Sequence, residues 1–219
     1  MHEGALIATP ASVTRLNPVL AWFLPVVLQA QAPSGAQVLK WCQQAYDSAT
    51  TLQEDVAATM STNNLTATAR ITFKRPGKLT VYGRSIFGAP YGLLSFDGLT
   101  WVKNGPMGWT SQKSPEVGIA TVTAVSGNAA LLVPAALFHT SWGRLADAKP
   151  KGPATMTELK GRKVYLVTSG GSVPRKYWID AETHFLVLTE LTAMKTKITV
   201  RFGPVKMNRP ISDKEFRRK

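Results

Sequence analysis

Residues 64–83 read NLTATARITFKRPGKLTVYG, and apolar and polar side chains alternate along this stretch. A period of two residues is typical of a β-strand with one buried face. Pro76-Gly77 is a turn signal, after which Leu79 and Val81 resume the alternation. The stretch therefore predicts two antiparallel strands that share one apolar face. Before the turn, the residues of that face are Leu65, Ala67, Ala69, Ile71 and Phe73.

A second turn follows at Asp97-Gly98, between Phe96 and Leu99. This pair tolerates the positive backbone angles of a type I′ hairpin turn. Residues 51–61 are predicted to form a preceding strand, and residues 107–110 are expected to close the series. The result is an antiparallel meander with one apolar face. The rest of the chain must cover that face or leave it open to a ligand.

Length and charge set the class of protein. The chain has 219 residues, of which 44% are hydrophobic, and we expect residues 33–219 to form a single domain. The net charge of +13 favours anionic partners, but basic residues spread singly along the chain are also typical of a solvated face. Cys42 is the single cysteine, so an internal disulfide and a multi-cysteine zinc site are excluded, and we expect it to be a buried core residue.

The first 32 residues have the features of an export signal. Arg15 precedes an apolar run at residues 18–28, which is too short to span a bilayer. Ala30-Gln31-Ala32 then gives the small-x-small pattern of a cleavage site. We expect a mature chain that begins near Pro33 in the periplasm or another exported compartment. A buried N-terminal strand is the alternative.

Helices are predicted at two places. Ser34 and Gln37 have the spacing of a capping box, and an apolar stripe follows from Val38 to Ala49. Ser114-Pro115 is a second start signal, and residues 117–143 are apolar on nearly all sides but contain helix-breaking Gly and Pro residues. We interpret this segment as two short, imperfect helices that pack on the apolar sheet face. They are either a mobile cover or a plain pair of core helices.

A second set of strands follows the loop at residues 146–153. The predicted strands are residues 163–168, 175–180, 185–191 and 195–202. Residues 185–188, FLVL, do not alternate, which suggests a central strand covered on both faces.

Three motifs resemble those of the periplasmic lipoprotein-carrier (LolA-like) family, which includes the outer-membrane lipoprotein-sorting proteins. Residues 74–79, KRPGKL, are similar to the family's RPGK turn. Residues 96–101, FDGLTW, resemble its DG-x-x-W hairpin, and residues 177–183, YWIDAET, its W-x-D-x-x-T strand and turn. Residues 202–216 are similar to its closing segment, so the resemblance extends over residues 37–216.

The resemblance implies an α+β fold that is mainly antiparallel β. Its sheet is a strongly curved, unclosed half-barrel whose concave face is covered by helices and binds acyl chains. This agrees with the apolar sheet face and the apolar cover that the residue pattern itself predicts. We therefore expect an exported carrier that shields the acyl chains of lipids or lipoproteins, with an envelope membrane protein as donor or acceptor. The alternative is an envelope regulatory module that uses the same fold to bind a protein partner.

The sequence offers little support for an enzyme, and we expect no cofactor and no metal. His139 and His184 are not at ligand spacing with another histidine, and Asp180 and Glu182 are explained by a turn. Residues 175–180, RKYWID, alternate aromatic and basic side chains, but an exported protein rarely meets nucleic acid, so we expect no such partner. We also expect a monomer.

Strand parity and the apolar cover together predict the ligand site. Small residues such as Ala67 and Ala69 are unusual in a tightly filled core but suit a bound chain. Phe96 and Trp101 flank the second hairpin, and a register slip of one residue would move each to the other face. The predicted ligand-binding residues are Leu65, Ala67, Ala69, Ile71, Phe73, Leu79, Val81, Phe96, Trp101, Leu131, Leu132, Leu137 and Phe138.

Overall fold

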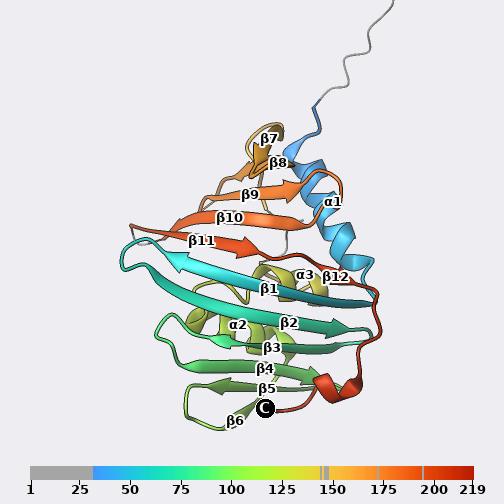
Figure 1. The fold of residues 1–219 in the computed structure, drawn as a ribbon, viewed down its shortest axis with the longest axis vertical. Coiled ribbons are helices and arrows are strands. Elements are labelled where there is room, and N and C mark those ends of the chain that lie inside the picture. The colour runs from blue at the N-terminus through green and yellow to red at the C-terminus, as the bar shows by residue number, and fades with distance from the viewer. Residues whose placement is uncertain (1–31, 144, 146–147, 172, 194) are drawn as a thin grey trace, which may run out of the picture. The chain divides into compact units, whose positions relative to one another are not determined.

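The structure is a computed structural model that describes residues 32–143, 145, 148–171, 173–193 and 195–219. The expected signal at residues 1–32 lies outside these residues except for its last position. Twelve strands of the described chain form one antiparallel sheet (Figure 1). The first six are β1 (Thr51–Met60), β2 (Leu65–Lys74), β3 (Lys78–Arg84), β4 (Pro90–Phe96), β5 (Leu99–Asn104) and β6 (Trp109–Gln112). The others are β7 (Thr155–Leu159), β8 (Arg162–Ser169), β9 (Arg175–Asp180), β10 (Leu186–Ala193), β11 (Thr196–Phe202) and β12 (Lys206–Met207).

The sheet is not closed. Its strand order is β6-β5-β4-β3-β2-β1-β11-β10-β9-β8-β7, and β12 pairs with β1 away from this path. Strand β1 joins the two predicted halves, because Ala58 lies opposite Ala67 of β2 on one side and Val200 of β11 on the other. The predicted meander and the second set of strands therefore share one sheet and one apolar face.

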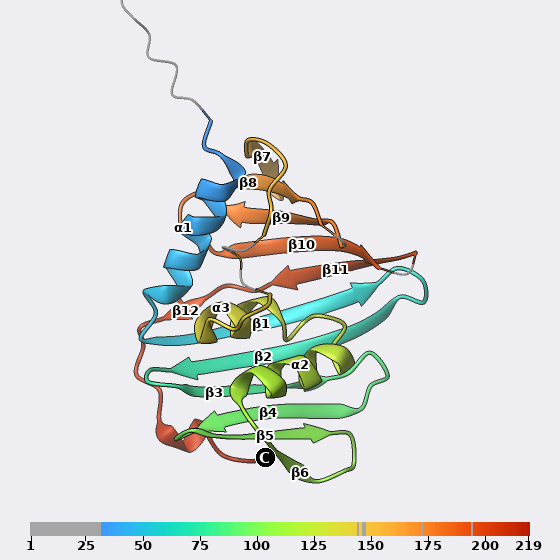
Figure 2. The same cartoon turned by 180° about the vertical axis from the view of Figure 1, so that it is seen from behind.

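Three α-helices of the described chain lie against the sheet. They are α1 (Gly35–Asp47), α2 (Pro115–Val125) and α3 (Leu132–Phe138). Figure 2 shows α2 and α3 lying across one face of the sheet, while α1 runs along the strand ends of β8–β10. We call the sheet face under α2 and α3 the covered face, and we call the opposite sheet face the outer face. The two short helices predicted after Ser114 are confirmed.

Capping and the apolar stripe explain α1. The Ser34 hydroxyl accepts a hydrogen bond from the Gln37 amide at 3.1 Å, which satisfies one free amide of the first turn. Val38, Cys42 and Tyr46 are fully buried, so the stripe faces the core as predicted. The single cysteine is a core residue, and burial raises the pKa of its thiol.

The predicted turns also form. Asp97 and Gly98 have φ values of 49° and 78°, as a type I′ turn requires, and Phe96 pairs with Leu99 across it. Gly77 has a φ of 67° at the turn between β2 and β3. The hairpins that set the register of the meander were therefore readable from the sequence.

One feature differs from the sequence interpretation. The loss of alternation in β10 comes from a register shift between Leu186 and Leu188, not from cover on both faces, and Leu188 is half-buried. The C-terminal segment also crosses the outer face, where Asp213 pairs with Lys74 and Lys78 at 2.7 and 2.8 Å. These hydrogen bonds lower the pKa of Asp213 to about 2.

No helix of the described residues is long and apolar enough to cross a membrane.

Candidate functional site

The centre of the covered face is apolar and buried. Ile71 lies opposite Val81, and Phe73 lies opposite Leu79, in the register of β2 and β3. All four side chains are at most 1% exposed. Alternation along each strand therefore places the predicted residues of β2 and β3 on one face, and Leu65 continues that face at the half-buried start of β2.

Small residues form a shallow band across three strands of the covered face. Ala58 of β1 lies opposite Ala67 of β2, and Ala69 of β2 lies opposite Gly83 of β3. A Cβ atom on Gly83 would lie 1.7 Å from the Thr68 carbonyl oxygen, so only glycine fits there. We call Ala58, Ala67, Ala69 and Gly83 the small-residue band. The three alanines leave room above the strands for another chain, whereas the Thr68 backbone and the Tyr91 hydroxyl close the space at Gly83.

The connection between α2 and α3 occupies this room. A Cβ atom on Gly127 would lie 3.9 Å from the Cβ of Ala58 and 3.0 Å from Cγ2 of Ile86. Ala129 and Ala130 of the same connection are buried. We call α2, α3 and the connection between them, residues 115–138, the cover. In this conformation the cover fills the covered face, so a ligand can enter only if the cover moves.

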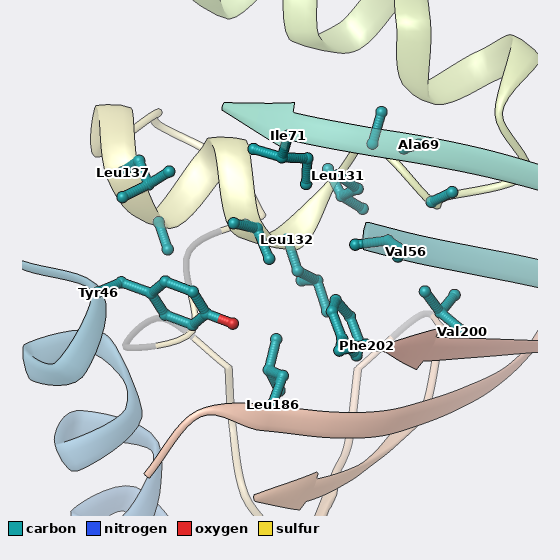
Figure 3. Packing of buried hydrophobic residues seen from close by; sticks show 14 of the residues in the cluster. Tyr46, Val56, Ala69, Ile71, Leu131, Leu132, Leu137, Leu186, Val200 and Phe202 are labelled. Atoms are coloured by element: carbon teal, nitrogen blue, oxygen red, sulfur yellow. The ribbon is translucent and has the colours of Figure 1, made fainter. Parts of the chain in front are cut away.

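Helix α3 brings larger apolar side chains to the same face. Leu131, Leu132 and Leu137 are 8%, 4% and 3% exposed. Figure 3 shows Leu131 and Leu132 between the start of α3 and the strands that carry Ile71 and Phe202. Phe138 is half-buried, and its ring lies edge-on to that of Phe73 with the centroids 6.0 Å apart. The four predicted residues of the cover therefore pack against the apolar face of the predicted strands.

Few polar contacts tie the cover to the rest of the protein. The Ile86 amide donates to the Val125 carbonyl at 3.2 Å, and Nε2 of Gln43 donates to the Ala136 carbonyl at 3.0 Å. At the C-terminal end of α3, His139 Nε2 lies 3.3 Å from Asp47 Oδ1 of α1. Helix α3 has no side-chain hydrogen bond at its N-terminus. Apolar packing therefore provides most of the attachment.

Phe96 and Trp101 do not belong to the covered face. Their register partners Leu99 and Leu94 place both rings on the outer face, one residue out of step with Leu93 and Val102. Lys78 Nζ lies 4.5 Å from the centroid of the Phe96 ring, and Arg218 Cζ lies 5.1 Å from that of Trp101. Both residues leave the candidate site because their rings lie on the outer face. The pattern alone did not fix their direction, because apolar side chains occupy both faces of β4 and of β5.

A buried polar pair was missed from the sequence. Glu54 on β1 is 2% exposed on the covered face, and Tyr46 of α1 donates its hydroxyl proton to Glu54 Oε2 at 3.4 Å. The other oxygen, Oε1, has no hydrogen-bond partner. Burial raises the pKa of the Glu54 carboxyl well above its usual value. The alternation of the strand could have placed Glu54 on the covered face, because Glu54 lies two residues from both Leu52 and Val56.

A separate hollow opens on the outer face. It has a volume of about 730 Å³, and its lining includes Arg70, Tyr82, Arg201 and Lys219. Arg70 is paired with Asp55 at 2.7 Å. The hollow also reaches Ala69 and Gly83 of the small-residue band, so it borders the candidate site from the other side of the sheet. Among the described residues, no group of three or more His, Cys, Asp or Glu side chains is placed to hold a metal ion.

Comparison with solved structures supports the architecture. MucB, which has also been solved in a complex with MucA from Pseudomonas aeruginosa, is 11% identical, with a TM-score of 0.51 over 84% of this chain and 62% of MucB. The chain has a LolA-like fold. Other similar structures include LprF from Mycobacterium bovis (14% identity, 83% of this chain and 100% of that chain, TM-score 0.48). A LolA superfamily protein from Nitrosomonas europaea also matches (10% identity, 85% and 99%, TM-score 0.38).

At these identities the likeness concerns the LolA-like fold alone. No family model matches the chain, and no curated protein matches it.

Proposed function

We propose that the protein is an exported carrier that binds an acyl chain of a lipid or lipoprotein on the covered face. The observation that carries the proposal is the small-residue band beneath a weakly tethered apolar cover. Ala58, Ala67 and Ala69 leave room on the strands, and the connection 126–131 fills part of that room at Gly127 without a bound chain. Displacement of this connection would expose an apolar trough.

The energetics of burial support this exchange. Burying about fifteen methylene groups contributes about 12 kcal/mol at about 0.8 kcal/mol per methylene. Opening the cover removes the contacts of Leu131, Leu132 and Leu137 from the sheet, and association carries its own entropic cost. An acyl chain on the same strands restores apolar contact, so the gain offsets a large part of both costs.

Native mass spectrometry of the protein purified from its own host tests the proposal. The expected spectrum contains the protein with an added mass of one or more acyl lipids, and organic extraction releases the same lipid. A matched sample stripped of lipid should take up a fluorescent fatty acid. A protein that is consistently empty and also refuses the fluorescent probe would remove the acyl-carrier proposal.

A second candidate is an envelope module that binds a protein partner. The MucB comparison favours it, because MucB has the same kind of fold and has been solved with MucA. The outer face offers the surface for such a partner, with Arg70 and Arg201 at the rim of the hollow of about 730 Å³.

Pulldown from envelope extracts separates the two candidates. The bait is the whole chain, stripped of lipid, with Arg201→Ala as a variant of the outer face and Ala69→Trp as a variant of the covered face. A stoichiometric partner that Arg201→Ala loses and Ala69→Trp keeps favours the protein-binding module. A cargo that binds only when acylated, and that Ala69→Trp loses, favours the carrier.

A further inference from the structure

Alternate connections of the antiparallel sheet meet at one end. The described residues of the five connections are 61–64, 85–89, 105–108, 170–171, 173–174 and 195, and we call them the loop end. Figure 1 shows the connections between β1 and β2, β3 and β4, and β5 and β6 on the same side of the sheet. Because neighbouring strands run in opposite directions, the other connections lie at the far end.

Exposed apolar side chains project from the loop end. Phe87 and Met107 are 81% and 65% exposed, and Val173 is 44% exposed. Large apolar side chains that stand out at one edge are typical of an interaction surface. The feature is therefore a candidate surface separate from the covered face.

The loop that carries Phe87 is held in place by hydrogen bonds. The Ser85 amide donates to the Ala89 carbonyl at 2.8 Å, and the Gly88 amide donates to the Ser85 carbonyl at 2.9 Å. Arg84 Nη1 also donates to the Gly88 carbonyl at 3.2 Å. A defined turn thus keeps the Phe87 ring in solvent, while its neighbour Ile86 packs against the cover near Gly127.

The charge of the loop end has one sign. The sequence of the five connections contains no Asp or Glu, whereas Asp97 and Glu182 lie in connections at the far end. Arg84 and Lys195 are exposed at the strand ends that border the loop end. Basic side chains beside protruding apolar ones match a membrane surface, where lipid phosphates lie next to the acyl region.

We propose that the loop end docks on an anionic membrane surface, with Phe87 and Met107 inserted between the headgroups and Arg84 and Lys195 against the lipid phosphates. This docking does not require acyl cargo. It would bring the junction of α2 with the β3–β4 loop close to the membrane, because Ile86 and Val125 share a backbone hydrogen bond of 3.2 Å.

Flotation with vesicles of phosphatidylglycerol and phosphatidylcholine, compared with phosphatidylcholine alone, tests the proposal on the whole chain. We expect binding to the anionic vesicles that weakens about tenfold in Phe87→Ser/Met107→Ser. The matched control is Leu99→Ser/Met156→Ser, two side chains that are 57% and 51% exposed away from the loop end. This control should bind like the unchanged protein.

Charge is tested in the same way. Arg84→Gln/Lys195→Gln should weaken binding about fivefold per charge. Lys160→Gln/Lys163→Gln removes the same charge at the far end and should have little effect, because both residues are exposed at the β7–β8 hairpin. Equal losses in both pairs would mean that net charge alone drives binding and would overturn the proposal.

A label gives a local readout. An environment-sensitive dye on Met107→Cys should shift to a shorter emission wavelength with anionic vesicles, and the same dye on Met156→Cys should not. Native Cys42 is fully buried and does not compete for the dye. The proposal is overturned by unshifted emission at position 107, by equal binding to uncharged vesicles, or by tighter binding to duplex DNA that the same variants weaken.

Discussion

A substitution at Ala69 tests the carrier proposal most directly among single residues. It is 3% exposed on the covered face, opposite Val56 and Gly83. Ala69→Trp should block uptake of a fluorescent fatty acid, because the indole would occupy the trough. Overpacking should lower the free energy of unfolding by about 1–3 kcal/mol.

Urea unfolding and probe titration give both readouts for Ala69→Trp. Thr66→Trp is the matched control, since Thr66 lies on the same strand but is exposed on the outer face. A folded Ala69→Trp protein that binds the probe as before would place the ligand somewhere else.

Glu54 predicts a dependence of stability on pH. Burial raises the pKa of its carboxyl, so the folded chain keeps the proton at pH values where the unfolded chain has lost it. The contribution of protonated Glu54 to the free energy of unfolding is fully present below the pKa of the unfolded state. This contribution is lost as pH rises through the pKa of the folded state. Glu54→Gln stays neutral in both states, so its stability relative to the unchanged protein should increase with pH.

Urea unfolding of Glu54→Gln from pH 4 to pH 8 measures this difference. Glu158→Gln is the control, because Glu158 is exposed on β7. Parallel stability curves for Glu54→Gln and the unchanged protein would show that Glu54 keeps an ordinary pKa in the fold.

Single residues also show where sequence reasoning stopped. Parity placed Ile71 and Phe73 correctly, because one face of β2 is polar. It did not place Phe96 and Trp101, because β4 and β5 carry apolar side chains on both faces and the C-terminal segment covers part of the outer face. Such cover comes from residues more than one hundred positions away, which local periodicity does not report.

Among the elements, α3 determines how firmly the cover is held. Its seven residues lack an N-terminal side-chain cap, and Phe138 meets Phe73 edge-on at 6.0 Å. Phe138→Ala should lower the free energy of unfolding by about 1–2 kcal/mol. It should also speed uptake of the fatty-acid probe, because the cover then opens at lower cost.

Stopped-flow fluorescence measures the uptake rate in Phe138→Ala. Phe96→Ala is a matched control, since Phe96 is also a half-buried ring but lies on the outer face. If both variants took up the probe at the original rate, movement of α3 would not limit entry.

The two short helices could be predicted from Ser114-Pro115 and from the apolar run with Gly118, Gly127 and Pro134. Their packing on the apolar sheet face was predicted as well, but the contacts of each helix were not, because an all-round apolar helix has no stripe that selects a partner. Strands β7 and β12 were also missed. The two residues of β12 pair with Leu52 and Gln53, and no local sequence pattern predicts this contact.

For the whole molecule, export remains a prediction that rests on Arg15, the apolar run 18–28 and Ala30-Gln31-Ala32. N-terminal sequencing of the protein from its own host should give a chain that begins near Pro33 outside the cytoplasm. A chain in the cytosol that retains residues 1–32 would contradict both the compartment and the carrier proposal.

The central claim is that an acyl chain lies between the sheet and its cover. Cross-linking with a photoreactive fatty acid, followed by tandem mass spectrometry, locates the chain by residue. We predict cross-links both to covered-face residues of β2 and β3 and to residues 126–138 of the cover, which a ligand on the outer face cannot reach. Cross-links confined to outer-face side chains and residues 213–219, with none in the cover, would contradict the account.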